Sequence, residues 1–205
     1  MPTRLESQLH LLERMAALDP PLHIIGGFAE DALIGARLSR EHEDVDWLVP
    51  RSELPERLEQ ARALGFTEFE TWGESAPGEP LYLTSRQGVL SIDIGVCNEV
   101  DGGHAIDVAR LMFQVDGAEA PAGFRMQLPP DTFTHDPVEL QGIRVWPASP
   151  LCLYQMRIGI AAKGAFGALN EKQMTSLRRL KDAFFPDRSD DDLMPRITPL
   201  PSPLA

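Results

Sequence analysis

Cysteine is scarce in this chain of 205 residues, which has only Cys97 and Cys152. Two thiols so far apart in the sequence cannot form the disulfide framework of a small secreted domain. They also lack the close spacing of a structural zinc site. A reducing compartment is therefore the expectation.

Long apolar stretches are absent as well. No uninterrupted apolar run approaches the roughly 20 residues that a membrane-spanning helix needs. Residues 1–21 are amphipathic and charged, without the apolar centre of a secretory signal peptide. Together with the scarcity of cysteine, this predicts a cytoplasmic protein with no membrane partner.

Positive charge is in the minority: 19 lysines and arginines stand against 31 aspartates and glutamates, for a net charge of -12. Proteins that bind nucleic acid gain most of their affinity by neutralising phosphates, so nucleic acid is not an expected partner. An acidic surface attracts small cations instead. An equally simple interpretation is that these acids only keep the protein in solution.

Two widespread catalytic signatures are missing from the sequence. It has no Gly-x-Ser-x-Gly elbow of the kind that presents a nucleophilic serine, and no P-loop ending in Gly-Lys-Ser or Gly-Lys-Thr. These two ways of carrying out hydrolysis or phosphate chemistry are therefore excluded.

Hydrophobic residues make up 43% of the chain, enough for a sizeable core. Apolar spacings of three and four predict helices over residues 4–18, 28–34, 54–64, 151–162 and 170–184. Short apolar or alternating runs predict strands over residues 22–25, 45–49, 66–72, 81–85 and 89–96, and a hairpin within 138–145. A loop is expected over residues 73–80, and irregular structure with short strands over 98–135.

This order of elements predicts an α+β fold, with a mixed twisted sheet, flanking helices and a short C-terminal helical lobe. We expect a core domain over residues 1–147 and a helical segment over 148–186. Residues 187–205 are rich in proline and carry an acidic run. They are expected to form an extended tail that packs weakly.

The first candidate for chemistry is Gly26-Gly27, between a predicted strand and a predicted helix. Glycines allow a ligand to approach the backbone closely, and the start of a helix offers unpaired N–H groups to a phosphate. On its own such a pair more often forms only a turn.

Three aspartates are the second candidate. Asp44 and Asp46 flank Val45 at the start of a predicted strand, so their side chains point to the same side, opposite the apolar residues. Asp93 lies on the polar side of another strongly alternating strand. Two neighbouring carboxylates repel each other and favour a bound cation, and magnesium prefers such oxygen ligands. An isolated pair of this kind is more often an ordinary feature of a solvent-facing strand.

In combination, these residues resemble the nucleotidyltransferase superfamily of DNA polymerase beta-like enzymes. Within it, residues 24–50 look like the aminoglycoside 2''-adenylyltransferase and lincosamide nucleotidyltransferase group. That group has a Gly-Gly-Trp-Ala-x-Asp segment, a later glycine, and then Arg-x-His-x-Asp-x-Asp. Phe28 replaces the usual tryptophan here. The close resemblance covers residues 22–50 and continues loosely to Asp93, to residues 143–155 and to the helix near Lys172.

The resemblance implies a role for each of these residues. Gly26 and Gly27 would hold the triphosphate of ATP or another nucleoside triphosphate, and Asp44 and Asp46 would bind one or two Mg2+ ions. Asp93 would be a third ligand, or the base that activates an acceptor hydroxyl. The acceptor would be a small, cationic, aminoglycoside-like molecule.

Other residues leave alternatives open. Asp107 could replace Asp93 as the third carboxylate. Arg40 could reach phosphate or could pair with Glu41 or Glu43. His42 is expected to be a structural hydrogen-bonding residue. Lys172 is the preferred phosphate contact on the C-terminal helix, Lys181-Asp182 is an alternative, and either lysine could simply lie on a solvated face.

Two competing functions make their own predictions. A nucleotidyltransferase toxin that modifies tRNA or protein would need a basic track near the site, for which the sequence offers only Arg178, Arg179 and Lys181. A non-catalytic binding protein of the same fold would have no third carboxylate within reach of Asp44 and Asp46.

Overall fold

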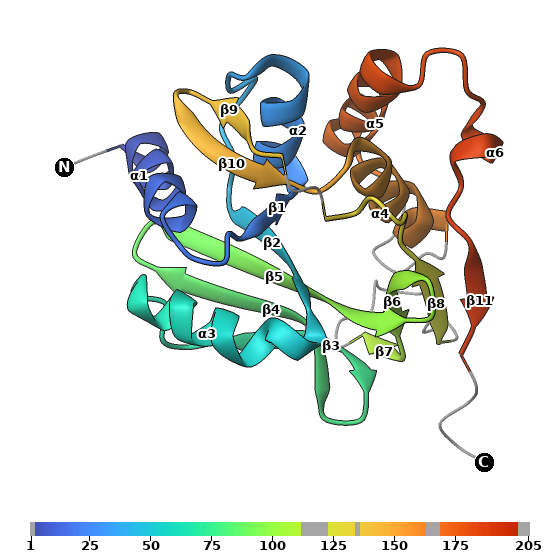
Figure 1. Ribbon diagram of the computed structural model, residues 1–205, viewed down its shortest axis with the longest axis horizontal. Helices are drawn as coiled ribbons and strands as arrows, with labels where there is room; N and C mark the ends of the chain where they lie inside the picture. The colour runs from blue at the N-terminus through green and yellow to red at the C-terminus, as the bar shows by residue number, and fades with distance from the viewer. Residues whose placement is uncertain (1–2, 112–122, 134–135, 163–168, 201–205) are drawn as a thin grey trace.

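A mixed sheet with flanking helices forms the fold (Figure 1). The structure, a computed structural model, describes residues 3–111, 123–133, 136–162 and 169–200. Its helices are α1 (Arg4–Ala16), α2 (Gly26–Gly35), α3 (Leu54–Ala63), α4 (Pro150–Ala162), α5 (Glu171–Phe184) and the short α6 (Asp190–Leu193), with a 3-10 turn at Arg51–Glu53.

Each predicted strand has a counterpart in the sheet. The strands are β1 (His23–Ile25), β2 (Val45–Pro50), β3 (Glu70–Ala76), β4 (Glu79–Gln87), β5 (Leu90–Val100), β6 (Gly103–Val108), β7 (Arg110–Leu111), β8 (Phe124–Gln127), β9 (Val138–Leu140), β10 (Ile143–Pro147) and β11 (Ile197–Pro199). Eight of them follow the order β11-β8-β6-β5-β2-β1-β10-β9. Off this path, β4 pairs with β5 and β3, and β3 also pairs with β7. The β2–β5 and β1–β10 pairs are parallel and the other pairs are antiparallel.

The alternation of β2 and β5 determines where the core lies. On β2, Val45, Trp47 and Val49 are fully buried, while the side chain of Asp46 points away from them and is half-buried. Ile92 and Ile94 on β5 are buried in the same way, with Asp93 on the other side. The apolar faces of both strands therefore join the core, and their aspartates share the opposite face.

Helices α2, α4 and α5 pack on one another beside the polar face of these strands (Figure 1), whereas α3 contacts β2. The α4 and α5 helices begin and end close to their predicted positions. Helix α5 starts from a capping box in which Asn170 accepts a hydrogen bond from the Gln173 amide and Gln173 bonds back to Asn170. The capping box therefore fixes the residue at which α5 begins.

The loop expected over residues 73–80 is wrong in its extent. Strand β3 continues to Ala76 and β4 begins at Glu79, so only Pro77 and Gly78 form the turn between them. Gly78 has a φ of 77°, which glycine adopts without strain. Of residues 98–135, the described part contains the end of β5, β6, β7 and β8, so it is more regular than predicted, and 112–122 and 134–135 lie outside the described residues.

The prediction of a weakly packed tail is also wrong for the residues that the structure describes. Leu193 is only 1% exposed, and β11 pairs with β8 at the edge of the sheet. Tyr154 and Lys181 both donate to Asp190, at 3.0 Å and 2.5 Å.

The division into segments 1–147, 148–186 and 187–205 stays a prediction. Within the described part of the chain, no helix is both long and apolar enough to cross a lipid bilayer.

Candidate active site

Three carboxylates meet where β2 and β5 lie side by side. The parallel register places Asp46 directly beside Asp93, and Asp44 comes just before β2. One oxygen from each of the three residues lies within 4.8 Å of the other two. Asp93 is therefore the third member of the cluster, in the position expected from its strand pattern.

The alternative third carboxylate, Asp107, is committed elsewhere. Arg125 donates two hydrogen bonds to it, at 2.6 Å and 2.7 Å, and Asn98 donates a third at 2.9 Å. Burial raises the pKa of Asp107, but the hydrogen bonds from Arg125 and Asn98 outweigh it, so the pKa is lowered overall. Asp107 is a structural ion-pair partner outside the cluster.

Burial and the mutual repulsion of the carboxylates both act on the cluster itself. Burial, and then the charge of Asp93, raise the pKa of Asp44. Burial, followed by the charges of Asp44 and Asp93, raises the pKa of Asp46 well above its usual value. Three oxygen donors that destabilise one another in this way are a suitable donor set for a divalent cation such as Mg2+.

Strand β4 holds Asp93 in place. The hydroxyl of Tyr82 donates to Asp93 Oδ2 at 2.9 Å, and Thr84 Oγ1 donates to Oδ1 at 2.8 Å. Burial, together with the carboxylates, raises the pKa of Tyr82 well above its usual value, so the phenol keeps its proton and acts as a donor. Tyr82 and Thr84 were not predicted as site residues, although they alternate with buried Leu81 and Leu83 on a strand that was predicted.

The two glycines lie against the cluster at the start of α2. A Cβ on Gly26 would lie 1.8 Å from Asp46 Oδ2, and the φ of Gly26 is 66°. A Cβ on Gly27 would lie 2.2 Å from His42 Nδ1 and 2.8 Å from Arg40 Nη2. No side chain caps this helix start, so its first N–H groups remain available to an anion.

Gly26→Ala is expected to abolish divalent-cation binding, because the new methyl group must displace the carboxylate of Asp46. The positive φ adds strain of about 1–2 kcal/mol. Gly78→Ala is the matched control, since Gly78 also has a positive φ but has open space around its Cα. Mn2+ titration calorimetry and urea unfolding measure both effects. Equal Mn2+ affinity in the two variants would contradict the close packing of Gly26 on Asp46.

The residues between α2 and β2 form a second, buried network around Asp31, which is fully buried. Asp31 accepts hydrogen bonds from the Ser39 amide at 2.8 Å, from Ser39 Oγ at 2.6 Å and from Arg179 Nη2 at 3.0 Å. The ring of His42 lies 2.9 Å away through Nε2. His42 is thus a buried structural residue, as expected, whereas the role of Asp31 was not predicted.

The predicted phosphate contacts lie at one side of the cluster. Arg40 donates to the carbonyl of Glu41 at 3.0 Å, and among the described residues it forms no ion pair with Glu41 or Glu43. Lys172 Nζ is 3.6 Å from Glu43 Oε1. Arg40, Lys172 and Arg179 line a common cavity of about 470 Å³. Lys181 instead pairs with Asp190 and lies outside this cavity.

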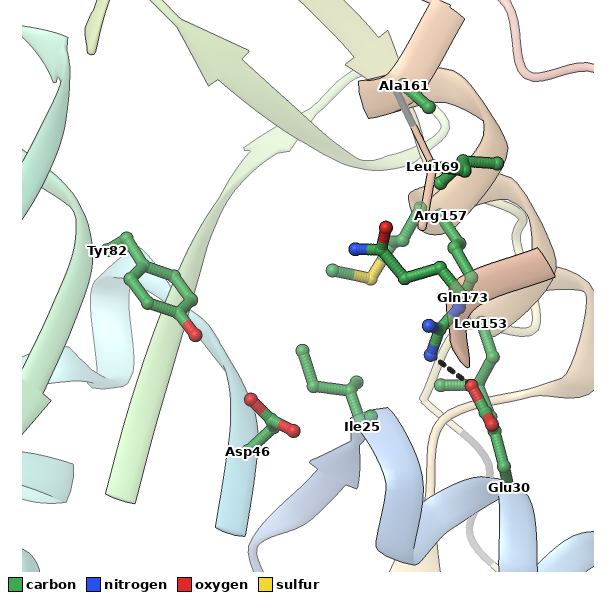
Figure 2. A pocket seen from close by; sticks show the side chains of 11 residues that line it. Ile25, Glu30, Asp46, Tyr82, Leu153, Arg157, Ala161, Leu169 and Gln173 are labelled. Carbon is green, nitrogen blue, oxygen red and sulfur yellow. Dashed lines mark hydrogen bonds and ion pairs between the residues drawn. The ribbon is translucent and has the colours of Figure 1, made fainter. Parts of the chain in front are cut away.

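Two further cavities open on the cluster from different directions. One, of about 230 Å³, is lined by Gly26, Asp46 and Tyr82 and by side chains of α4 and α5 (Figure 2). The other, of about 710 Å³, is lined by Glu43, Asp44 and Asp93, among others. The carboxylates therefore lie between two cavities, and each cavity could hold a different molecule.

Comparisons with known proteins give the same fold. No family model and no curated protein matches the chain. A solution structure of the antibiotic-resistance factor ANT(2'')-Ia has a TM-score of 0.62 at 18% identity, covering 91% of this chain and 87% of that one. A crystal structure of ANT(2'')-Ia in complex with adenylyl-2''-tobramycin has a TM-score of 0.59 at 17% identity, covering 93% of each chain. The predicted resemblance to this group of nucleotidyltransferases is thereby confirmed for the fold, which the chain shares with ANT(2'')-Ia.

Proposed function

We propose that this protein is a metal-dependent nucleotidyltransferase that transfers AMP from ATP to a hydroxyl of a small cationic acceptor. The observation that carries the proposal is the meeting of Asp44, Asp46 and Asp93 beside the glycine-led start of α2. Carboxylates that hold a cation, next to N–H groups that hold a phosphate, are the two parts that phosphoryl chemistry needs.

Each residue has a role in this proposal. Asp44, Asp46 and Asp93 would hold Mg2+, which when bound neutralises phosphate charge and makes the acceptor hydroxyl more acidic. The N–H groups of Gly26 and Gly27 bind the triphosphate. Arg40 and Lys172 bind its far end, because they line the cavity next to Gly27.

The chemistry is a substitution at the α-phosphorus of ATP. The acceptor oxygen forms a bond to this phosphorus while the bond to the bridging oxygen of pyrophosphate breaks, and pyrophosphate leaves. The hydroxyl proton passes to the carboxylate of Asp93, which Tyr82 and Thr84 orient.

The charge of the larger cavity supports a cationic acceptor. Glu43, Asp44 and Asp93 contribute to its lining, with Trp72 and two arginines. A net charge of -12 favours the approach of a polyamine-like molecule at long range. ANT(2'')-Ia, which shares the fold, has been crystallised with adenylyl-2''-tobramycin, so aminoglycosides are the first acceptors to screen.

The competing functions have less support. The side chains of Arg179 and Lys181 are paired with Asp31 and Asp190, which argues against a basic track for tRNA. A non-catalytic binding protein was expected to lack a third carboxylate near the pair, and the position of Asp93 argues against it.

Calorimetric titration of ATP, with and without Mg2+, tests the proposal. We expect Mg2+-dependent binding that Asp44→Asn weakens at least about tenfold, because a charged ligand of the metal is lost. Asp101→Asn, at an exposed turn distant from the cluster, is the control and should bind as the wild type does. Pyrophosphate release on addition of an aminoglycoside then tests transfer. Failure of the wild type to bind ATP, GTP, CTP and UTP would overturn the proposal.

A further inference from the structure

Arg157 places a positive charge in the cavity that Asp46 and Gly26 line (Figure 2). It comes from α4, which lies across the cavity from Asp46. Among the described residues that line this cavity it is the one cation. Its charge lowers the pKa of Asp46, against the larger effects of burial and of the neighbouring carboxylates.

A buried partner holds the guanidinium in a fixed position. Arg157 Nη2 donates to Glu30 Oε1, and the side chains of Arg157 and Glu30 are 18% and 3% exposed. The other carboxylate oxygen of Glu30 accepts a hydrogen bond from Ser176 Oγ on α5. Glu30 thus links α2, α4 and α5, and both of its oxygens are engaged.

The guanidinium has donors to spare. It carries five N–H groups, and its Nε is buried with no acceptor among the described residues. A buried donor without an acceptor costs about 1–3 kcal/mol, and structures that keep one often do so for a ligand. The side chain of Arg157 is 18% exposed and lines the cavity, so a ligand there would meet the terminal N–H groups of the guanidinium and not the buried Nε.

The position of the two glycines indicates which part of a nucleotide would lie there. Gly26 faces Asp46, whereas Gly27 faces His42 and Arg40. A phosphate chain that followed the start of α2 would therefore run from the cavity of Arg157 to the cavity of Arg40. The first phosphate of that chain lies beside Asp46, where the transferred group must react.

The remaining walls of the cavity suit the rest of the nucleotide. Ile25, Leu153 and Leu169 are apolar, and Gln173 offers an amide that can both donate and accept. This combination of apolar walls with one amide fits a nucleoside better than a polycation.

Building on the proposed function, we propose that Arg157 contacts the α-phosphate of the nucleotide, and that Glu30 is the positioning residue that holds its guanidinium. The contact strengthens as charge develops on the transferred phosphoryl group, so Arg157 acts on the rate as well as on binding. Arg40 and Lys172 act on the leaving pyrophosphate instead.

Titration of Mg2+-ATP and of Mg2+-pyrophosphate into the same variants separates these roles. We expect Arg157→Gln to weaken ATP binding at least about tenfold and to change pyrophosphate binding less than about twofold. Glu30→Gln should also weaken ATP binding more than pyrophosphate binding, but by less than Arg157→Gln does. Arg40→Gln should weaken both ligands.

The double variant Glu30→Gln/Arg157→Gln is the control for unfolding. Each single variant leaves one buried charge without its partner, whereas the double variant removes both charges. Equal losses for ATP and pyrophosphate, or wild-type ATP binding in the Arg157 variants, would overturn the role of Arg157. Those results leave the proposed function intact, since the wild type would still bind nucleotide. Absence of nucleotide binding by the wild type would instead overturn both.

Discussion

Asp46→Asn is expected to lower the rate of nucleotidyl transfer at least about a thousandfold, which corresponds to about 4 kcal/mol in the activation barrier. The same change should raise the free energy of unfolding of the metal-free protein by on the order of 1–3 kcal/mol, because it removes one of three carboxylates that repel one another. Urea unfolding in EDTA and a pyrophosphate-release assay measure the two effects.

The gain in stability should depend on pH. The pKa of Asp46 is raised in the folded state above its unfolded value of about 3.8. The folded protein therefore holds a proton that the unfolded chain releases, and stability is lost as the pH rises through the folded pKa. Asp46→Asn should accordingly stabilise the protein little near pH 4 and most at neutral and alkaline pH.

Asp107→Asn is the matched control for both effects. The pKa of Asp107 is lowered in the folded state, because Arg125 and Asn98 donate to its carboxylate, so its charge stabilises the fold above its unfolded pKa. Asp107→Asn should therefore destabilise the protein and leave the rate of transfer within a few-fold. A loss of stability in Asp46→Asn at pH 8 without metal would contradict the repulsion within the cluster.

Divalent cations should make the wild type more stable than Asp46→Asn, which is the reverse of the order expected without metal. A ligand that binds only the folded state stabilises it by mass action, so Mg2+ should raise the unfolding temperature of the wild type. Asp46→Asn should show little of this increase. The three carboxylates would then destabilise the fold when no metal is bound, and be retained because they bind the metal.

The carboxylate cluster could be predicted from the sequence because strand alternation is a local signal. Each aspartate follows from its own strand, and the resemblance over residues 22–50 connects them. The parallel register that brings Asp46 beside Asp93 is a long-range feature, and only the structure gives it. Tyr82 and Thr84 were missed because their role depends on that pairing.

The buried networks could not be predicted, since their partners are far apart in the chain. Glu30 and Arg157 are separated by 127 positions, and no local pattern joins them. The tail was mispredicted for a different reason. Proline removes hydrogen-bond donors and indicates weak packing, but an edge strand tolerates it, and Pro199 ends β11 at the edge of the sheet.

Asp31→Asn is expected to destabilise the protein by about 3 kcal/mol, because it removes the charge of a fully buried carboxylate that pairs with the partly exposed Arg179. Burial alone would raise the pKa of Asp31, but hydrogen bonds from His42, Ser39 and Arg179 outweigh it and lower the pKa overall. The contribution of Asp31 to stability is therefore present above its unfolded pKa and lost as the pH falls through its folded pKa. Urea unfolding over a pH series from pH 7 down to about pH 2 measures this, because the contribution is lost only below the unfolded pKa.

The position of the network gives the same variant a functional effect. Ser39 and His42 belong to the segment that leads into Asp44 and β2, and Asp31 fixes this segment to α2 and α5. Asp31→Asn should thus weaken Mn2+ binding as well as the fold. Glu13→Gln removes an exposed contact with His10, at 3.4 Å, and is the control that should change neither. Similar stability of the two variants would contradict the buried network, whereas a large loss of stability with unchanged Mn2+ affinity would show that the metal ligands are positioned without it.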